Sequence, residues 1–281
     1  MKLRRILIMA LSLIMALAML AGCSGGDGKK YIVLEENFGE ESFSVGMRLG
    51  DNALTLKIHE IMDDKIADGK ADEIAQKWFG ENVVLKGVDF PRAIDAAAAD
   101  DTSLQYILDK GTLILGLDEN FPPMGYRDES GEIVGFDIDL AKEVATRLGV
   151  ELVIQPIDWA AKEMELQNKN IDVIWNGMSV TEERAAGMNL SKPYLANRQI
   201  IIVPEGSDIK TKADLAGKKV AIQAGSSALD AVNADAATAA IIGELVEFAD
   251  NNSAFLDLKA GRVDAFVVDE TYGRYLIANN D

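Results

Sequence analysis

Cysteine and histidine are nearly absent from this sequence, which holds one of each among 281 residues. One cysteine excludes an intramolecular disulfide framework and any zinc site built from several thiolates. One histidine excludes the multi-histidine metal sites, and Ser-His-Asp or Cys-His catalysis would have to use His59 alone. His59 lies in a helical stretch, where we expect it on a solvated helix face. We therefore expect no metal, no cofactor and no catalytic residue of these classes, while carboxylate, lysine or arginine chemistry stays open.

Basic residues are also scarce, with 28 Lys and Arg against 46 Asp and Glu and a net charge of -18 at pH 7. Nucleic acids need a basic protein face to meet their phosphates, so we expect no nucleic-acid partner. With 48% apolar and 26% charged residues, the chain is neither disordered nor fibrous. Its length allows two domains or one large α/β domain with a sizeable core.

The apolar run from Ile6 to Ala21 is shorter than the roughly 18–20 residues that a membrane-spanning helix needs. It follows a basic start and precedes small residues, so residues 1–22 are typical of a secretory signal peptide. The sequence Leu-Ala-Gly-Cys that ends at Cys23 resembles the bacterial lipobox, in which the cysteine is acylated. The alternative is an ordinary cleavage site that leaves Cys23 free. Residues 23–30, rich in Gly, form a flexible tether in the first interpretation.

Strands and helices alternate along the chain from residue 104 onward. This alternation predicts βαβ units, mainly parallel sheets, and ligand sites at the carboxyl ends of the strands. Residues 86–103 bury little and are expected to be a linker. The expected helices are a broken pair over 50–80, capped by Asp51 or Asn52, and 137–148 and 163–167. The expected strands are 31–34, 43–48, 112–117, 152–154, 172–175, 199–203, 219–222 and 265–268.

A loop that enters a short helix contains the clearest candidate for anion binding. Thr181 suits the helix N-cap, and Arg184 follows one turn later. The arginine fork can hold both oxygens of a carboxylate. The alternative is that Arg184 forms a surface ion pair. A second strand, glycine turn and helix start at 223–228 supplies further N–H donors, although alone it is a weak signal.

Several longer motifs occur together, and in combination they resemble the polar amino acid-binding proteins that serve bacterial ABC importers. The resemblance covers nearly all of the chain after the tether. It implies an α/β fold of the type II periplasmic-binding-protein kind, in which two lobes, each a mainly parallel sheet flanked by helices, are joined by two crossing strands and close on one amino acid. The motifs are Phe-Pro-Pro-Met-Gly-Tyr at 121–126, Gly-Glu-Ile-Val-Gly-Phe-Asp-Ile-Asp-Leu at 131–140, Asn-Gly-Met-Ser-Val-Thr-Glu-Glu-Arg at 176–184 and Leu-Ser-Lys-Pro-Tyr at 190–194, with further matches at 214–222 and 261–269.

The resemblance implies a role for individual residues. Arg184 would hold the α-carboxylate of the ligand, and Asp269, from the other lobe, would hold its α-ammonium group. Phe121 and Trp159 would enclose the ligand side chain, the alternative for both being a place in the core. The other implied ligand residues are Asp118, Asn120 and Gln223 at the polar end of the side chain, Ser179, Ser226 and Ser227 beside the carboxylate, the Gly177 carbonyl at the ammonium group, and Asn176 and Met178 in the same loop.

A zwitterion that leaves water needs both of its charges met, because an unpaired buried charge costs several kcal/mol. With Arg184 and Asp269 on different lobes, the ligand itself bridges the cleft. Binding would then favour the closed state through contacts that only this state makes.

The order of the segments differs from the order usual in this family. Residues 43–80 resemble the family's ending, yet they precede residues 104 onward, which resemble its beginning. Joining Asp281 to Lys30 would rebuild one copy, so we expect a circular permutant; the alternative is a fragment of a tandem pair. The expected parts are lobe 1 at 43–194 with the linker 86–103, lobe 2 at 31–39 and 199–281, and a hinge at 40–42 and 195–198.

Together these inferences predict a monomeric, extracytoplasmic binding protein that is not an enzyme and is anchored to the membrane by a lipid on Cys23. It would capture a free polar L-amino acid and pass it to the permease subunits of an ABC-type importer. The alternatives are an amino-acid-sensing receptor module and a dehydratase-like enzyme on the same fold. Glutamine, cystine, histidine, arginine and lysine all stay open as ligands.

Overall fold

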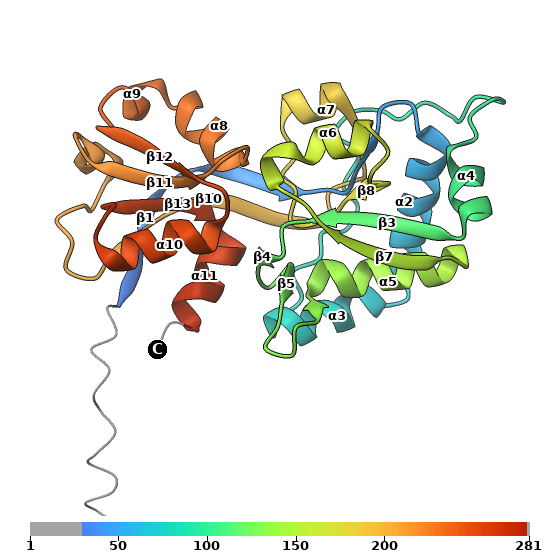
Figure 1. Cartoon of the computed structure of the whole chain (residues 1–281), viewed down its shortest axis with the longest axis horizontal. Helices are drawn as coiled ribbons and strands as arrows, with labels where there is room; N and C mark the ends of the chain where they lie inside the picture. Colours follow the sequence, from blue (N-terminus) through green and yellow to red (C-terminus); the bar gives the residue numbers. More distant parts are fainter. Residues whose placement is uncertain (1–29, 280–281) are drawn as a thin grey trace, which may run out of the picture.

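The structure, a computed structural model, describes residues 30–279. The expected signal peptide, the expected lipidation site Cys23 and nearly all of the expected tether lie outside the described residues. The described chain forms two lobes, each built around a five-stranded sheet, with helices on both sides of each sheet (Figure 1). The two-lobed α/β architecture that the sequence predicts is confirmed.

Lobe 1 is defined here by the sheet with strand order β7-β3-β8-β2-β9. Its strands are β2 (Gly46–Arg48), β3 (Thr112–Leu117), β7 (Glu151–Pro156), β8 (Val173–Ile174) and β9 (Met188–Leu190). A small sheet of β4 (Asn120–Phe121), β5 (Gly125–Arg127) and β6 (Ile133–Val134) extends it. Its helices are α2 (Asn52–Ala67), α3 (Lys70–Phe79), α4 (Ser103–Lys110), α5 (Phe136–Leu148), η1 (Trp159–Ala161), α6 (Lys162–Gln167) and α7 (Glu182–Gly187).

Lobe 2 is defined by the sheet with strand order β1-β10-β13-β11-β12. Its strands are β1 (Tyr31–Phe43), β10 (Leu195–Pro204), β11 (Lys219–Gln223), β12 (Glu244–Phe248) and β13 (Ala265–Asp269). Its helices are η2 (Lys212–Leu215), α8 (Ser227–Ala234), α9 (Ala236–Ala239), α10 (Asn251–Ala260) and α11 (Glu270–Ala278).

Both sheets are mixed, which differs from the expectation of mainly parallel pairing. In lobe 1, β3 pairs in parallel with β7 and β8, while β2 pairs antiparallel with β8 and β9. In lobe 2, β11 pairs in parallel with β12 and β13, while β10 pairs antiparallel with β1 and β13. The alternation of strands and helices in the sequence predicts the direction only of those strands that a crossover helix connects. Strands that enter a lobe from the other lobe need no such crossover and can run antiparallel.

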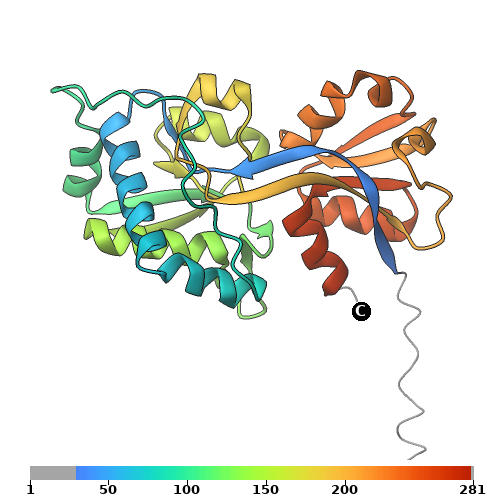
Figure 2. The same ribbon diagram turned by 180° about the vertical axis from the view of Figure 1, so that it is seen from behind.

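Two strands cross between the lobes side by side, β1 and β10 (Figure 2). Their antiparallel register runs from the pair Tyr31 and Pro204 to the pair Phe43 and Leu195, with two register shifts. Separate strands at 31–34 and 43–48 were expected, because the polar stretch between them has the composition of a loop. The structure makes one strand, Tyr31–Phe43, since backbone pairing with β10 decides the conformation rather than local propensity.

The sheet of lobe 2 is covered on both faces, as the side-chain alternation of β10 shows. Ile201 and Val203 pack in one apolar cluster, whereas Ile200 and Ile202 pack in another on the opposite face. All four side chains are buried. A strand that is apolar on both faces lies in the interior of a lobe. The part of β10 beyond the crossing therefore lies inside lobe 2.

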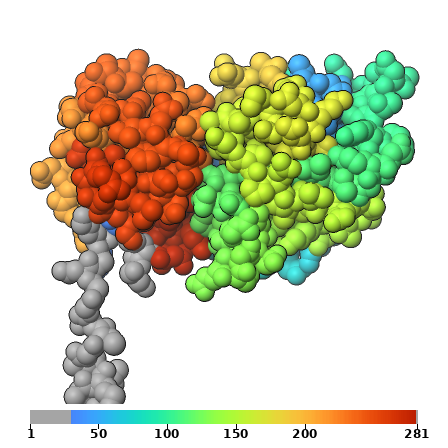
Figure 3. All heavy atoms as spheres, viewed as in Figure 1, coloured from blue at the N-terminus to red at the C-terminus, as the bar shows by residue number. Residues whose placement is uncertain are grey.

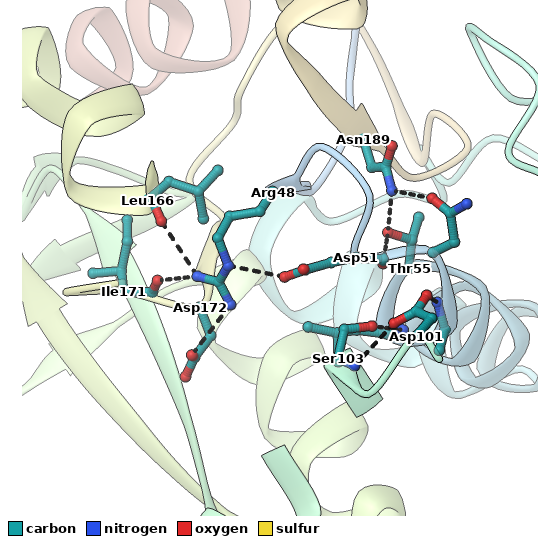
Figure 4. Close-up of polar contacts among 12 residues, drawn as sticks. Arg48, Asp51, Thr55, Asp101, Ser103, Leu166, Ile171, Asp172 and Asn189 are labelled. Atoms are coloured by element: carbon teal, nitrogen blue, oxygen red, sulfur yellow. Dashed lines mark hydrogen bonds and ion pairs between the residues drawn. The ribbon is translucent and has the colours of Figure 1, made fainter. Parts of the chain in front are cut away.

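Arg48 connects the end of β2 to the segment between α6 and the neighbouring strand β8 (Figure 4). Its guanidinium donates hydrogen bonds to the carbonyl oxygens of Ile171 at 2.8 Å and Leu166 at 3.3 Å. It also forms ion pairs with Asp51 at 2.9 Å and Asp172 at 3.7 Å. Because Arg48 is buried, these partners replace the water that its charge loses.

The start of α2 is capped by a residue distant in the sequence (Figure 4). Asp51 occupies the N-cap position but its side chain makes no capping hydrogen bond, and Asn52 is the first residue of the helix. Asp101 instead accepts a hydrogen bond from the backbone N–H of Ala53 at 2.7 Å. Asp51 is therefore the N-cap residue, as expected, but the side chain that accepts from the first turn belongs to Asp101, at the end of the segment between α3 and α4.

The expectation of a solvated His59 is wrong. The residue is 7% exposed, and its ring lies 4.7 Å from that of Phe90. Phe90 belongs to the irregular segment between α3 and α4, which folds back over this part of α2. His59 also lies 2.8 Å from Asp63, and burial lowers the pKa of the imidazole. Helical periodicity alone could not reveal a cover supplied by a loop.

Candidate ligand-binding site

A cavity of about 10 Å³ is lined by residues of both lobes. On the face that Figure 3 shows, the surfaces of the two lobes touch. An amino acid is larger than this space, so its entry requires the lobes or the cleft side chains to move. The structure brings eleven of the thirteen residues implied by the sequence motifs to this one cavity. They are Asp118, Phe121, Trp159, Asn176, Gly177, Ser179 and Arg184 from lobe 1 and Gln223, Ser226, Ser227 and Asp269 from lobe 2.

Met178 and Asn120 do not line the cavity. Met178 lies between two cavity residues, and its fully buried side chain packs into a core cluster of lobe 1 with Trp159 and Leu190. The preceding Gly177 has φ of +58°, so the chain bends there and the cavity-lining positions on either side do not fix the direction of the Met178 side chain. Asn120 is exposed, and its backbone N–H donates to Asp118 at 2.9 Å. Neither of these two expected ligand residues therefore contributes to the lining of the cavity in this structure.

Arg184 is a buried cation held by carbonyl groups. Thr181 caps α7 by accepting a hydrogen bond from the Arg184 backbone N–H at 3.1 Å, as the sequence suggests. The guanidinium donates to the carbonyl of Ser179 at 2.8 Å and, across the cleft, to that of Gly225 at 3.3 Å. Arg184 is 6% exposed and forms no ion pair with any carboxylate of residues 30–279. A surface ion pair, the alternative interpretation, therefore does not describe its environment.

Asp269 ends β13 on the opposite side of the cavity. Its Oδ1 accepts hydrogen bonds from Asn197 at 2.6 Å and from Gln199 at 2.9 Å, both on β10. Burial, and then the negative charge of Glu41, raise the pKa of the Asp269 carboxyl above its usual range. A cation beside Asp269 would reverse this effect by stabilising the ionised form.

Glu41 is a residue of this region that the motifs did not indicate. It lies on the crossing strand β1, and its Oε2 accepts from the Ser179 hydroxyl at 2.6 Å and the Ser227 hydroxyl at 3.1 Å. These hydroxyls belong to different lobes. The same oxygen accepts from Gln199 at 2.9 Å and Asn197 at 3.3 Å. The only available signal was an acidic residue in a segment predicted to cross between lobes.

The far end of the cavity is closed by a polar contact between the lobes. Gln223 of lobe 2 donates to Asp118 of lobe 1 at 2.7 Å, and Asn251 donates to Gln223 at 2.8 Å. Burial raises the pKa of Asp118. These side chains offer both a negative charge and amide groups to the polar end of a ligand.

Both aromatic residues expected to enclose the ligand side chain line the cavity, and one of them also stacks on a third ring. The ring of Phe121 stacks on that of Tyr272 of α11, with centroids 5.2 Å apart and planes 6° apart. Trp159 is buried, and the Lys162 ammonium lies 5.1 Å from its ring centroid. Tyr272 comes from the other lobe, so its stacking on Phe121 is a contact across the cleft. Nothing in the motifs identified Tyr272.

Lys162, also absent from the motifs, joins the lobes beside Arg184. It is 2% exposed, and its ammonium donates to the Gly225 carbonyl at 2.8 Å and to the Trp159 carbonyl at 3.2 Å. Burial, followed by the charge of Arg184, lowers the pKa of Lys162 to about 8. Gly225 therefore accepts hydrogen bonds from two cations of lobe 1.

The arrangement can hold a small molecule that carries both charges, with anion binding at Arg184 and cation binding at Asp269. Among residues 30–279, no group of three or more His, Cys, Asp or Glu side chains is placed to hold a metal ion. In the same part of the chain, no helix has the length and apolar content needed to cross a membrane.

Comparison with known proteins gives consistent matches. The sequence profile of the bacterial extracellular solute-binding proteins, family 3, matches residues 113–274. An L-cystine-binding protein of Escherichia coli K12 is 31% identical over 173 residues, which are 61% of this chain and 64% of the relative. The chain thus spans about two thirds of the length of this curated relative.

Solved structures of other proteins are similar to this chain in both sequence and fold. A histidine-bound substrate-binding protein of an ABC uptake transporter from Streptococcus pneumoniae is 36% identical, with a TM-score of 0.62 over 64% of this chain and 75% of that chain. An arginine-bound, truncated arginine-binding protein from T. maritima is 43% identical, with a TM-score of 0.58 over 63% of this chain and 82% of that chain. These identities support a likeness in sequence as well as in fold.

Proposed function

The chain belongs to family 3 of the bacterial extracellular solute-binding proteins, and from this membership we propose that it captures a polar L-amino acid between its two lobes and delivers it to an ABC-type importer. The observation that carries the proposal is Arg184, a buried cation with no carboxylate partner in the described chain. A buried guanidinium gains most from an anion that arrives with the ligand, since its own desolvation is then compensated.

The second charge of the ligand would be met by Asp269. Because Arg184 belongs to lobe 1 and Asp269 to lobe 2, one zwitterion can touch both lobes only when they are closed. The binding free energy then shifts the equilibrium towards closure. Such a mechanism needs no bond making or breaking, in line with a carrier rather than an enzyme.

The charge of the cleft favours an amino acid with a cationic side chain. Glu41, Asp118 and Asp269 stand against Arg184, because the charge of Lys162 is paired with that of Glu163 at 3.1 Å. The region is therefore negative when these groups are ionised, and an arginine, a lysine or a protonated histidine, each with a net charge of +1, reduces this excess. The arginine-bound and histidine-bound relatives support this choice, whereas cystine, the ligand named for the E. coli relative, is neutral.

The proposal includes an extracytoplasmic location and a lipid anchor on Cys23. The family name supports the location, and the lipobox-like sequence before Cys23 supports the anchor. The protein would work as a monomer that meets the permease subunits at the membrane. Mass spectrometry of the membrane-extracted chain tests the anchor, because acylation at Cys23 adds the mass of the fatty acyl groups to a chain that begins there.

We also propose that the chain is circularly permuted relative to its family. Residues 31–79 lie outside the match at 113–274, yet they supply β1 to one sheet and β2 to the other. The proposed parts remain lobe 1 at 43–194, lobe 2 at 31–39 and 199–281, and the hinge at 40–42 and 195–198. Segment 86–103 would then bridge the ends of the usual order.

A thermal-shift panel over the common amino acids and cystine tests the binding function. A ligand at 100 times its Kd stabilises the folded state by about 2.7 kcal/mol. We expect a shift with at least one basic amino acid, and its complete loss in Arg184→Ala and in Asp269→Ala. The control is Arg147→Ala, which removes an exposed arginine paired with Asp64 and should keep the shift.

Binding retained in both cleft variants would refute the assigned site. A purified chain that shifts with no amino acid would refute the function, and turnover of a bound ligand would favour an enzyme instead.

A further inference from the structure

We propose that Glu41, on the crossing strand β1, is a further ligand-binding residue that holds the α-ammonium group of the amino acid together with Asp269. The inference rests on the proposed function, since it adds a residue to that site. It goes beyond the motifs, which place the ammonium group on Asp269 and the Gly177 carbonyl.

Glu41 lies where the lobes and the crossing strands meet. Its Oε2 accepts from hydroxyls of both lobes, Ser179 at 2.6 Å and Ser227 at 3.1 Å, and both serines line the cavity. Glu41 does not itself line the cavity in this structure. Because it is bonded to two cavity-lining residues from opposite lobes, it lies directly behind them and can reach a ligand that displaces these hydroxyls. Of the four glutamates of β1, Glu35, Glu36 and Glu40 are exposed, and only Glu41 is partly buried in this region.

Glu41 and Asp269 form a carboxylate pair that shares its donors. Gln199 Nε2 lies 2.9 Å from Glu41 Oε2 and 2.9 Å from Asp269 Oδ1, so these oxygens are at most 5.8 Å apart. Asn197 Nδ2 also bridges them, at 3.3 Å and 2.6 Å. Two neutral amides do not neutralise two negative charges at this separation, so the pair takes up either a proton or a cation, and a bound cation favours the ionised form of both carboxyls.

The same place holds an excess of hydrogen-bond acceptors. The side-chain carbonyl oxygens of Asn197 and Gln199 are buried and have no donor among residues 30–279. Arg184, the other charged group lining this side of the cavity, donates to the carbonyls of Ser179 and Gly225 and to neither carboxylate. Buried acceptors without donors cost free energy. The amide nitrogens of both residues are used on Glu41 and Asp269, so the polar groups around the two carboxylates offer no further donor.

A primary ammonium matches this environment. It has three N–H donors and one positive charge, whereas water has two donors and no charge. The α-ammonium of an amino acid whose carboxylate is held at Arg184 is the cation that the proposed function brings to this side of the cleft. Glu41 thus makes the ammonium subsite doubly anionic, and it adds a ligand contact from the crossing strand to those from the two lobes.

The test measures Kd by isothermal titration calorimetry for Glu41→Gln against the matched control Glu40→Gln. Both substitutions remove one negative charge from adjacent positions of one strand. The probes are L-arginine and L-histidine, each compared with its analogue lacking the α-amino group, 5-guanidinopentanoate and imidazole-4-propionate. We expect Glu41→Gln to raise the Kd of an amino acid at least about tenfold, as for a charge-assisted hydrogen bond. Glu40→Gln should change it less than about threefold.

The analogues separate a ligand contact from a structural role. Glu41→Gln should leave the Kd of the analogues nearly unchanged, because they have no ammonium group to lose. Equal weakening of amino acid and analogue, or an effect no larger than that of Glu40→Gln, would overturn the inference and leave the proposed function intact. If the unmodified chain binds none of the amino acids of the thermal-shift panel, the proposed function fails and the inference with it.

A second substitution guards against misfolding. Glu41→Asp keeps the charge but withdraws the carboxylate by one methylene, and its expected effect has the same direction. Melting temperatures of the ligand-free variants show whether each has folded. A folded Glu41→Asp chain with unchanged discrimination between amino acid and analogue would contradict the contact.

Discussion

Asp137 is a carboxyl group buried directly behind the ligand-binding loop. It is fully inaccessible, and its Oδ2 accepts a hydrogen bond from the Gly177 backbone N–H at 2.7 Å. Burial raises the pKa of Asp137 to about 7, against the smaller opposing effects of Gly177, Tyr194 and Trp175. The residue therefore orients Gly177 at the cost of a carboxyl group that resists ionisation.

The raised pKa predicts a specific pH dependence of stability. The unfolded carboxyl titrates near pH 3.9, so the contribution of Asp137 is fully present below about pH 4 and is lost as the pH rises through about 7. Asp137→Asn keeps an acceptor for Gly177 but does not titrate. We expect its free energy of unfolding, relative to that of the unmodified chain, to rise between pH 4 and 8, by up to about 4 kcal/mol.

Urea unfolding at several pH values measures this difference. Asp139→Asn, two residues further along α5 and ion-paired with Lys77, serves as the control and should run parallel to the unmodified chain. Parallel profiles for Asp137→Asn as well would show that Asp137 does not titrate in this range.

At the residue scale, the sequence predicted the cavity residues that lie in contiguous motifs. Arg184 and Thr181, the N-cap residue of α7, could be recognised because one short segment of the sequence contains both. Glu41 and Lys162 were missed, since each reaches the cleft only through the packing of segments far apart in the chain. A local pattern carries no information on such contacts. Met178 was expected at the site because it lies in a motif. Membership of a motif does not determine which way a side chain points.

At the scale of elements, the turn between β11 and α8 controls how closely the lobes approach. Gly225 has φ of +66°, a left-handed conformation that favours glycine. A Cβ atom there would lie 2.9 Å from the Cα of Ala160 in the other lobe. The Gly225 carbonyl also accepts hydrogen bonds from Lys162 and Arg184. This turn therefore needs glycine both for its own conformation and for closure.

Gly225→Ala should weaken ligand binding by about tenfold or more, because the added methyl group meets backbone atoms that cannot move independently. The matched control is Gly217→Ala. Gly217 has φ of +69° with open space around the position of a Cβ. Both variants should lose about 1–2 kcal/mol of unfolding free energy through backbone strain. Calorimetry and urea unfolding separate the two effects, and equal Kd values for both variants would exclude a steric role for Gly225 in closure.

At the scale of the whole molecule, each lobe is assembled from segments that are far apart in the sequence. β2 lies between β8 and β9 in lobe 1, and β1 borders β10 in lobe 2. The motifs predicted two lobes and two crossing strands. The mixture of parallel and antiparallel pairing could not be predicted, because the direction of a strand in its sheet depends on whether the chain enters it from the same lobe or from the other one. The ends of the described chain are neighbours, since Tyr31 and Glu35 border one surface groove with Ile277 and Ala278 (Figure 1).

The neighbouring ends make the proposed permutation testable by rearranging the chain. The rearranged chain has residues 101–279, a short Gly-Ser connection, and then residues 30–85. It keeps Asp101, which caps α2, and the backbone hydrogen bond from Leu85 to Tyr194, and it omits the segment that covers His59. Because the cleft residues and both sheets are retained, we expect the same ligand preference and a Kd within about threefold.

A control rearrangement opens the chain between Ile114 and Leu115, inside β3, which pairs with β7 and β8. A break there removes a central strand of lobe 1 from continuous pairing, and this chain should not fold. Circular dichroism and the Kd of the panel ligand compare the two chains. Failure of the first chain to fold would mean that segment 86–100 is an integral part of lobe 1 rather than a bridge, because Phe90 and its neighbours would then be needed to cover α2.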